Sequence, residues 1–193
     1  YKELLNKFLS GRMPQNSGIN KIFFQDFFDK CPVLGWLLLK PLLKCFLSEK
    51  SDKSSDKEEI KEEGKKKEPV NSTHQRLLAV EMVGHLIKAS ENNEEAMKLM
   101  KKNLQLLTSI LIKVVDSVNT WGNKKVQKTG QCINLFTKSA KILLKSKESN
   151  DVTLISEQGA RLVNALQAAC EKDKTMSNLK GKAKEISRLV KNA

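Results

Sequence analysis

The sequence is poor in aromatic residues, glycine and proline, and this scarcity narrows the fold class. Aromatic residues make up 5% of the 193 residues, and there are nine glycines and four prolines. Sandwiches and barrels of β-strands need many tight turns and many aromatic or β-branched residues, so they fit this composition badly. The abundance of leucine, lysine and isoleucine favours an all-α fold instead.

The sequence also lacks the spacings that metal sites and catalytic sites need. Cys31, Cys45, Cys132 and Cys170 stand far apart without a CxxC pair, which also favours a reducing environment. The two histidines, His74 and His85, lie about three helical turns apart without a third ligand. Glycine-rich phosphate loops and nucleophile elbows are absent from the sequence as well. We therefore expect no metal, no cofactor, no small-molecule substrate and no catalytic residues.

No apolar run is long enough to cross a bilayer. The longest one, Cys31 to Leu47, is interrupted by two prolines and two lysines and falls short of the ~20 residues that a transmembrane helix needs. The prediction is that no membrane is spanned.

Residues 1–47 are predicted to form short helices that pack on the rest of the chain. Apolar residues recur there at helical spacing, namely Leu4, Leu5, Phe8 and Leu9, and then Phe23, Phe24, Phe27 and Phe28. A buried helix should follow over Leu34–Leu47, with Pro32 in its first turn and a kink near Pro41. We expect these aromatic residues and the two tryptophans to fill the core, although buried aromatic contacts also anchor partners.

A charged segment separates this block from the remainder. Residues 48–70 contain few aliphatic side chains among many Lys, Glu, Asp and Ser residues. Such a composition buries too little apolar surface to offset the entropy of ordering, so it predicts a disordered linker.

Residues 71–193 show five amphipathic helical patterns. Asn92 or Asn93 is suited to cap the second helix, and Asn150 or Asp151 the fourth. The apolar stripe of each helix in turn is Ala79, Met82, Val83 and Leu86; Met100, Leu104, Leu107, Leu111, Val114 and Val118; Val126, Thr129, Ile133, Phe136, Ala140 and Leu143; Ile155, Gly159, Leu162, Leu166 and Ala169; Met176, Leu179, Ala183, Ile186 and Val190. Long helices with short polar breaks favour antiparallel hairpins stacked as a HEAT- or armadillo-like solenoid, and a helical bundle is the alternative.

Positive charge is concentrated in two of these helices. The chain carries a net charge of +13; residues 120–148 hold seven lysines against one glutamate, and residues 172–193 hold seven basic against two acidic residues. If the two helices pack side by side, their basic faces form one surface suited to phosphates or to acidic protein segments. The candidate binding residues are Lys124, Lys125, Lys128, Lys138, Lys141, Lys145, Lys180, Lys182, Lys184 and Arg188.

A family resemblance is carried by three consecutive features: the block FFQDFFDKCPVLGWLLLKPLLKCFL (Phe23–Leu47), the charged insert, and then HQRLLAVEMVGHLIKA (His74–Ala89) with lysine-rich helices after it. This order of segments resembles the C-terminal helical part of the family of Myb-binding protein 1A and the fungal polymerase-phi-like nucleolar proteins. The resemblance implies a nucleolar protein with an armadillo-like body that acts in ribosomal RNA transcription and ribosome assembly. The polymerase label would need convergent carboxylates, which have no match here, so no catalytic residue is carried over.

These observations predict that the chain is a non-catalytic scaffold that is located in the nucleus or nucleolus and also in the cytoplasm. Its expected partners are transcription factors or ribosome-assembly factors, with RNA or DNA at the basic faces. Two alternatives stay open: a peripheral membrane or trafficking adaptor, and a regulatory domain of a larger enzyme, since the sequence opens on Tyr1 and is expected to be a fragment.

Overall fold

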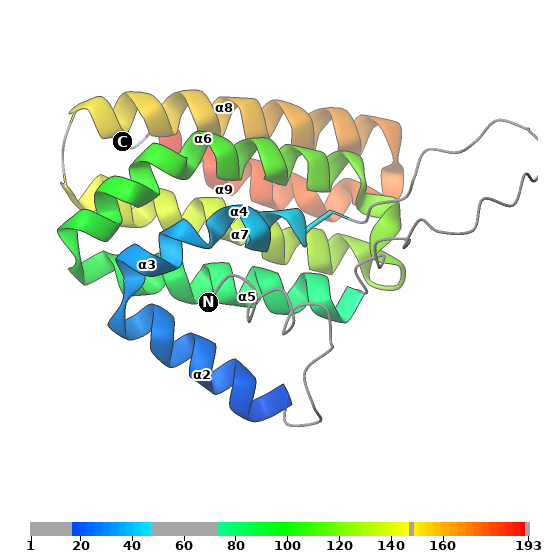
Figure 1. Cartoon of the computed structure of the whole chain (residues 1–193). Coiled ribbons are helices and arrows are strands. Elements are labelled where there is room, and N and C mark those ends of the chain that lie inside the picture. The colour runs from blue at the N-terminus through cyan, green and yellow to red at the C-terminus, as the bar shows by residue number, and fades with distance from the viewer. Residues whose placement is uncertain (1–16, 48–72, 147–148, 192–193) are drawn as a thin grey trace, which may run out of the picture.

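The computed structural model describes residues 17–47, 73–146 and 149–191, and every regular element in those ranges is helical. The all-α prediction is confirmed (Figure 1). The predictions for residues 1–16 and for the linker 48–70 lie outside the described residues. The helices are α2 (Ser17–Lys30), α3 (Pro32–Leu37), α4 (Leu39–Lys44), α5 (Thr73–Ala89), α6 (Glu94–Asp116), α7 (Lys125–Leu143), α8 (Ser149–Lys172) and α9 (Lys180–Lys191), with 3-10 turns η1 (Ser90–Asn92), η2 (Val118–Trp121), η3 (Leu144–Ser146) and η4 (Lys174–Leu179).

The helix expected over 34–47 is divided into α3 and α4 at Leu38. Pro41 has no N–H to donate to the carbonyl of Leu37, and its ring crowds that carbonyl. The chain tightens instead: the backbone N–H of Leu38 donates to Gly35 O at 2.9 Å, and α4 then starts at Leu39. The kink is therefore a complete break, one turn before the proline.

Of the helix caps predicted from the sequence, the one at Asn93 is present in the structure and the one at Asp151 is not. The side chain of Asn93 accepts a hydrogen bond from the N–H of Ala96 at 2.9 Å, as a cap of α6 should. Asp151 does not cap α8, because that helix already begins at Ser149. Its carboxylate is buried and forms an ion pair with Lys101 of α6. A buried carboxylate needs such a partner, and this contact joins α6 to α8.

The helices form two rows of neighbours. In one row α2 packs on α5, α5 on α7, and α7 on α9; in the other, α6 packs on α8. Figure 1 shows α2, α5 and α7 stepping from one side of the molecule towards α9, with α6 and α8 side by side at the opposite side. The short helices α3 and α4 contact α5, and α3 also contacts α6, so residues 17–47 lie against the later helices.

The core contains nearly all of the predicted stripe positions. Every stripe residue of the α5 and α6 patterns is buried, and the later stripes are buried except for the half-buried Val126, Ala169 and Val190. Met176 and Leu179 are buried as predicted, but they belong to η4 rather than to the last helix. Trp36 and Trp121 are both buried, as are Phe24 and Phe28, so these four aromatic residues belong to the core. The expectation is wrong for Phe23, Leu34 and Leu37, which are exposed because they lie on the sides of α2 and α3 that do not face α5.

A buried arginine joins three distant segments. Arg76 of α5 is 1% exposed; its Nε donates to Phe46 O at 2.8 Å, and its Nη1 donates to Thr120 O at 3.0 Å. Its guanidinium carbon lies 3.6 Å from the centre of the Trp121 ring. Burial lowers the pKa of Arg76 from its ordinary value. The contact holds the ends of α4 and η2 against the start of α5.

Candidate docking groove and basic surfaces

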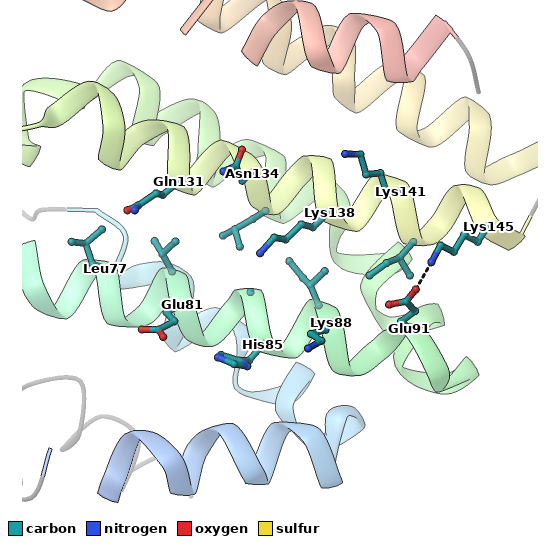
Figure 2. A pocket seen from close by; sticks show the side chains of 15 residues that line it. Leu77, Glu81, His85, Lys88, Glu91, Gln131, Asn134, Lys138, Lys141 and Lys145 are labelled. Carbon is teal, nitrogen blue, oxygen red and sulfur yellow. Dashed lines mark hydrogen bonds and ion pairs between the residues drawn. The ribbon is translucent and has the colours of Figure 1, made fainter. Parts of the chain in front are cut away.

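An open groove of about 720 Å³ runs between α5 and α7. Its floor is apolar, since residues at helical spacing on the two helices face each other across it: Leu77, Val80, Gly84 and Ile87 from α5, and Leu135 and Ile142 from α7. Figure 2 shows that the two helices run in the same direction, with Leu77 facing Gln131 at one end and Glu91 facing Lys145 at the other. The lining therefore follows α5 and the adjoining turn η1 from Leu77 to Glu91, roughly 21 Å at about 1.5 Å per residue.

The rim of this groove is charged. Lys138 of α7 points across the groove towards α5, whereas Lys141 points away from it (Figure 2). Lys88 lies on the α5 side, and within the described ranges neither Lys88 nor Lys138 has an ion-pair partner. Glu91 forms an ion pair with Lys145 that closes one end. The other acidic residue of the rim is Glu81.

A shared carboxylate connects α7 with α9. Glu185 of α9 accepts a hydrogen bond from Lys182 at 2.9 Å and lies 3.7 Å from Nζ of Lys141. The bond from Lys182 and the nearby lysine charges lower the pKa of Glu185. Lys141 and Lys182 are therefore partly neutralised, and this side of α9 is less basic than the sequence indicated.

The other flank of α9 carries an uncompensated basic surface. Lys180, Lys184, Arg188 and Lys191 line a second groove of about 640 Å³ against α8, whose floor includes Leu166, Cys170 and Ala183. All four cations are exposed, and none has an ion pair with another described residue. Glu171 is the acidic residue among the lining side chains. We call these four residues the α9 basic face.

The three candidate lysines at the start of α7 lie elsewhere, in or beside the turn that precedes the helix. Lys124 has a left-handed backbone, with φ of 60°, and is exposed. Lys125 donates to Asn119 at 2.7 Å and pairs with Asp173 at 3.1 Å. Lys128 donates to the carbonyl of Trp121 at 3.0 Å. The ten candidates thus divide between the turn, the α5/α7 groove, the Glu185 contact and the α9 basic face.

Sequence reasoning missed the contribution of α5 to the groove. Lys88, Glu81 and Glu91 were absent from the candidates because they look like an ordinary solvated flank of a helix. Their position in the sequence does carry a signal, since Glu81 and Lys88 are seven residues apart and so share one side of the helix. That this side faces α7 depends on the packing of two helices far apart in sequence.

Two of the described cysteines, Cys45 and Cys132, are poor nucleophiles. Burial raises the pKa of Cys132 to about 12 and that of Cys45 to about 11, so both thiols stay protonated near neutral pH. Among residues 17–47, 73–146 and 149–191, no three His, Cys, Asp or Glu side chains meet in a way that would hold a metal ion. No described helix combines the length and the apolar character needed to span a bilayer.

Comparisons of the chain with protein-family models, with curated proteins and with solved structures find no match.

Proposed function

We propose that this chain is a non-catalytic scaffold segment of the nucleus or nucleolus that binds RNA or DNA through the α9 basic face. The α9 basic face is the observation that carries this proposal. Four cations on one flank of a 12-residue helix, without a described carboxylate partner, attract phosphates without a prior ion pair to break. Lysines make up three of the four, which favours contact with the phosphate backbone over reading of bases.

The proposal extends to the architecture and to the cellular role. Helices α6 and α7, and then α8 and α9, serve as successive hairpins of a HEAT- or armadillo-like solenoid, with α5 in the row of α7 and α9. The neighbour relations α5 with α7 and α6 with α8 support this arrangement, because stacked repeats place equivalent helices side by side. The role in ribosomal RNA transcription, ribosome assembly or transcription regulation follows from the family resemblance of the sequence.

The test is a titration of the chain against labelled ribosomal RNA and random duplex DNA, followed by fluorescence anisotropy at low and near-physiological salt. The triple variant Lys184→Glu, Arg188→Glu, Lys191→Glu reverses the charge of three of the four residues of the α9 basic face. Its matched control is Lys98→Glu, Lys102→Glu, Lys113→Glu, which reverses three exposed lysines of α6 with the same change in net charge.

We expect binding that weakens steeply with salt, and an affinity about tenfold or more lower in the α9 variant than in the α6 control. Equal loss in both variants would mean that overall charge, and not this face, attracts the nucleic acid. Absence of binding at low salt would refute the proposal.

A further inference from the structure

The α5/α7 groove has the dimensions of a seat for a helix. Its lining extends along α5 and η1 from Leu77 to Glu91, roughly 21 Å, which equals about four turns of an α-helix. It is an open trough between two helices that run side by side, and its floor residues are held by the core beneath them. A preformed floor costs a ligand little reorganisation of the protein. A rod-shaped partner lying along the helices fits this shape.

The chemistry of the floor and the rim indicates which kind of helix would bind in the groove. Leu77, Val80 and Leu135 offer an apolar contact to the apolar stripe of an amphipathic helix. Lys138 points into the groove and Lys88 borders it from the other side, both without a described carboxylate partner. Carboxylates on the partner would form ion pairs with these two lysines.

The same groove is less suited to a nucleic-acid backbone than to a helix. Its floor is apolar, and phosphates gain nothing from an apolar floor. The α9 basic face has one acidic residue beside its four cations, so the two grooves differ in chemistry.

We infer that the α5/α7 groove is a docking site for an amphipathic helix of a partner protein whose flanks carry Glu or Asp residues opposite Lys138 and Lys88. This site is separate from the α9 basic face, so the inference does not depend on nucleic-acid binding.

The experiment measures binding of a capped, fluorescein-labelled peptide of about four helical turns. The peptide has leucines at helical spacing on one face, glutamates along the flanks and glutamines elsewhere. Two control peptides carry lysines in place of the glutamates, or serines in place of the leucines. The protein variants are Lys88→Glu with Lys138→Glu, which reverses the rim, and Gly84→Met, which places a side chain in the trough.

The Gly84→Met variant distinguishes a loss of peptide binding caused by obstruction of the groove from one caused by misfolding of the protein. A Cβ at Gly84 would meet Leu135 Cδ2 at 3.6 Å, an ordinary contact, and methionine favours a helix more than glycine does. We expect this variant to keep or raise its melting temperature while its affinity for the acidic peptide falls about tenfold. The rim variant should lose about tenfold as well, and Lys98→Glu with Lys102→Glu on α6 should change little.

Four results would refute the inference. The first is equal affinity for the glutamate and lysine peptides at low salt, and the second is unchanged binding in both groove variants. The third is a loss of affinity for the labelled RNA or DNA, but not for the peptide, in the Gly84→Met variant, which would make the groove a nucleic-acid site. Loss of peptide binding in the α9 variant alone would also refute it, because the acidic helix would then bind at α9.

Discussion

At the scale of single residues, Arg76 is the clearest case of a side chain whose role cannot be read from its neighbours in sequence. A helical wheel places it on the apolar face of α5, three residues before Ala79 and seven before Val83, where a charged side chain is unexpected. The structure buries it because Trp121 supplies an aromatic face and the carbonyls of Phe46 and Thr120 supply acceptors. A planar guanidinium can stack and donate at the same time, which an ammonium group cannot.

Replacing Arg76 with lysine should therefore destabilise the fold although the charge is kept. The carbonyls of Phe46 and Thr120 would lose donors in a buried place, and we expect a loss of about 2–3 kcal/mol in the free energy of unfolding. Urea denaturation followed by circular dichroism measures the loss. Arg188→Lys on the exposed side of α9 is the control and should be neutral; a similar loss in both variants would contradict the role of the buried site.

Asp173 should make stability depend on pH in an acidic window. The side chain and N–H of Thr175 donate to it and Lys125 pairs with it, which together lower its pKa from the ordinary 3.8 to about 2. Because the folded pKa is depressed, the contribution is fully present above about pH 4 and is lost as the pH falls towards 2. Urea midpoints across this window should converge for the wild type and Asp173→Asn. A constant gap between the two proteins down to pH 2 would rule the effect out.

At the scale of elements, two glycines with the same propensity should respond in opposite ways to alanine. Gly130 of α7 and Gly159 of α8 both lie inside helices and are buried. A Cβ at Gly159 would lie 2.5 Å from Val190 Cγ2, where α8 and α9 approach closely, whereas one at Gly130 would lie 3.8 Å from Leu179 Cδ2.

Gly159→Ala should lower the free energy of unfolding by about 1–3 kcal/mol, since the β-branched Val190 cannot turn away. Gly130→Ala should raise it by about 0.5–1 kcal/mol, because alanine favours the helix and meets only ordinary contact. Thermal melts of the two variants give the comparison. Stabilisation in both would show that α9 shifts freely on α8.

The sequence predicts the elements better than their relations. Apolar spacing located α5 to α8, because one side of each helix is buried and spacing reports that side directly. Asp151 was predicted as a cap, but α8 begins two residues earlier, and the Asp151 carboxylate pairs with Lys101 of α6, a partner that spacing within one helix cannot reveal. The placement of the basic residues also depends on packing: Lys182 and Lys184 are two residues apart, so they lie on different flanks of α9, and only the packing decides which flank meets α7 or α8.

At the scale of the whole molecule, the excess of positive charge should weaken the fold at low ionic strength. A net charge of +13 on 193 residues repels itself, and salt screens this repulsion. We expect the melting temperature to rise by about 2–4 °C between very low salt and about 0.15 M sodium chloride. Calorimetry checks the prediction; a falling melting temperature would mean that the described ion pairs outweigh the repulsion.

The two buried tryptophans touch opposite ends of α5. Trp121 lies beneath Arg76, near the start of that helix, and Trp36 donates to the hydroxyl of Ser90, directly after its end, at 2.9 Å. Since the sequence contains two tryptophans, all indole emission of the chain originates at these two points. The helix that forms one wall of the α5/α7 groove therefore has a native optical probe at each end, and a Trp36→Phe or Trp121→Phe variant would let intrinsic fluorescence follow either end separately, without any dye attached.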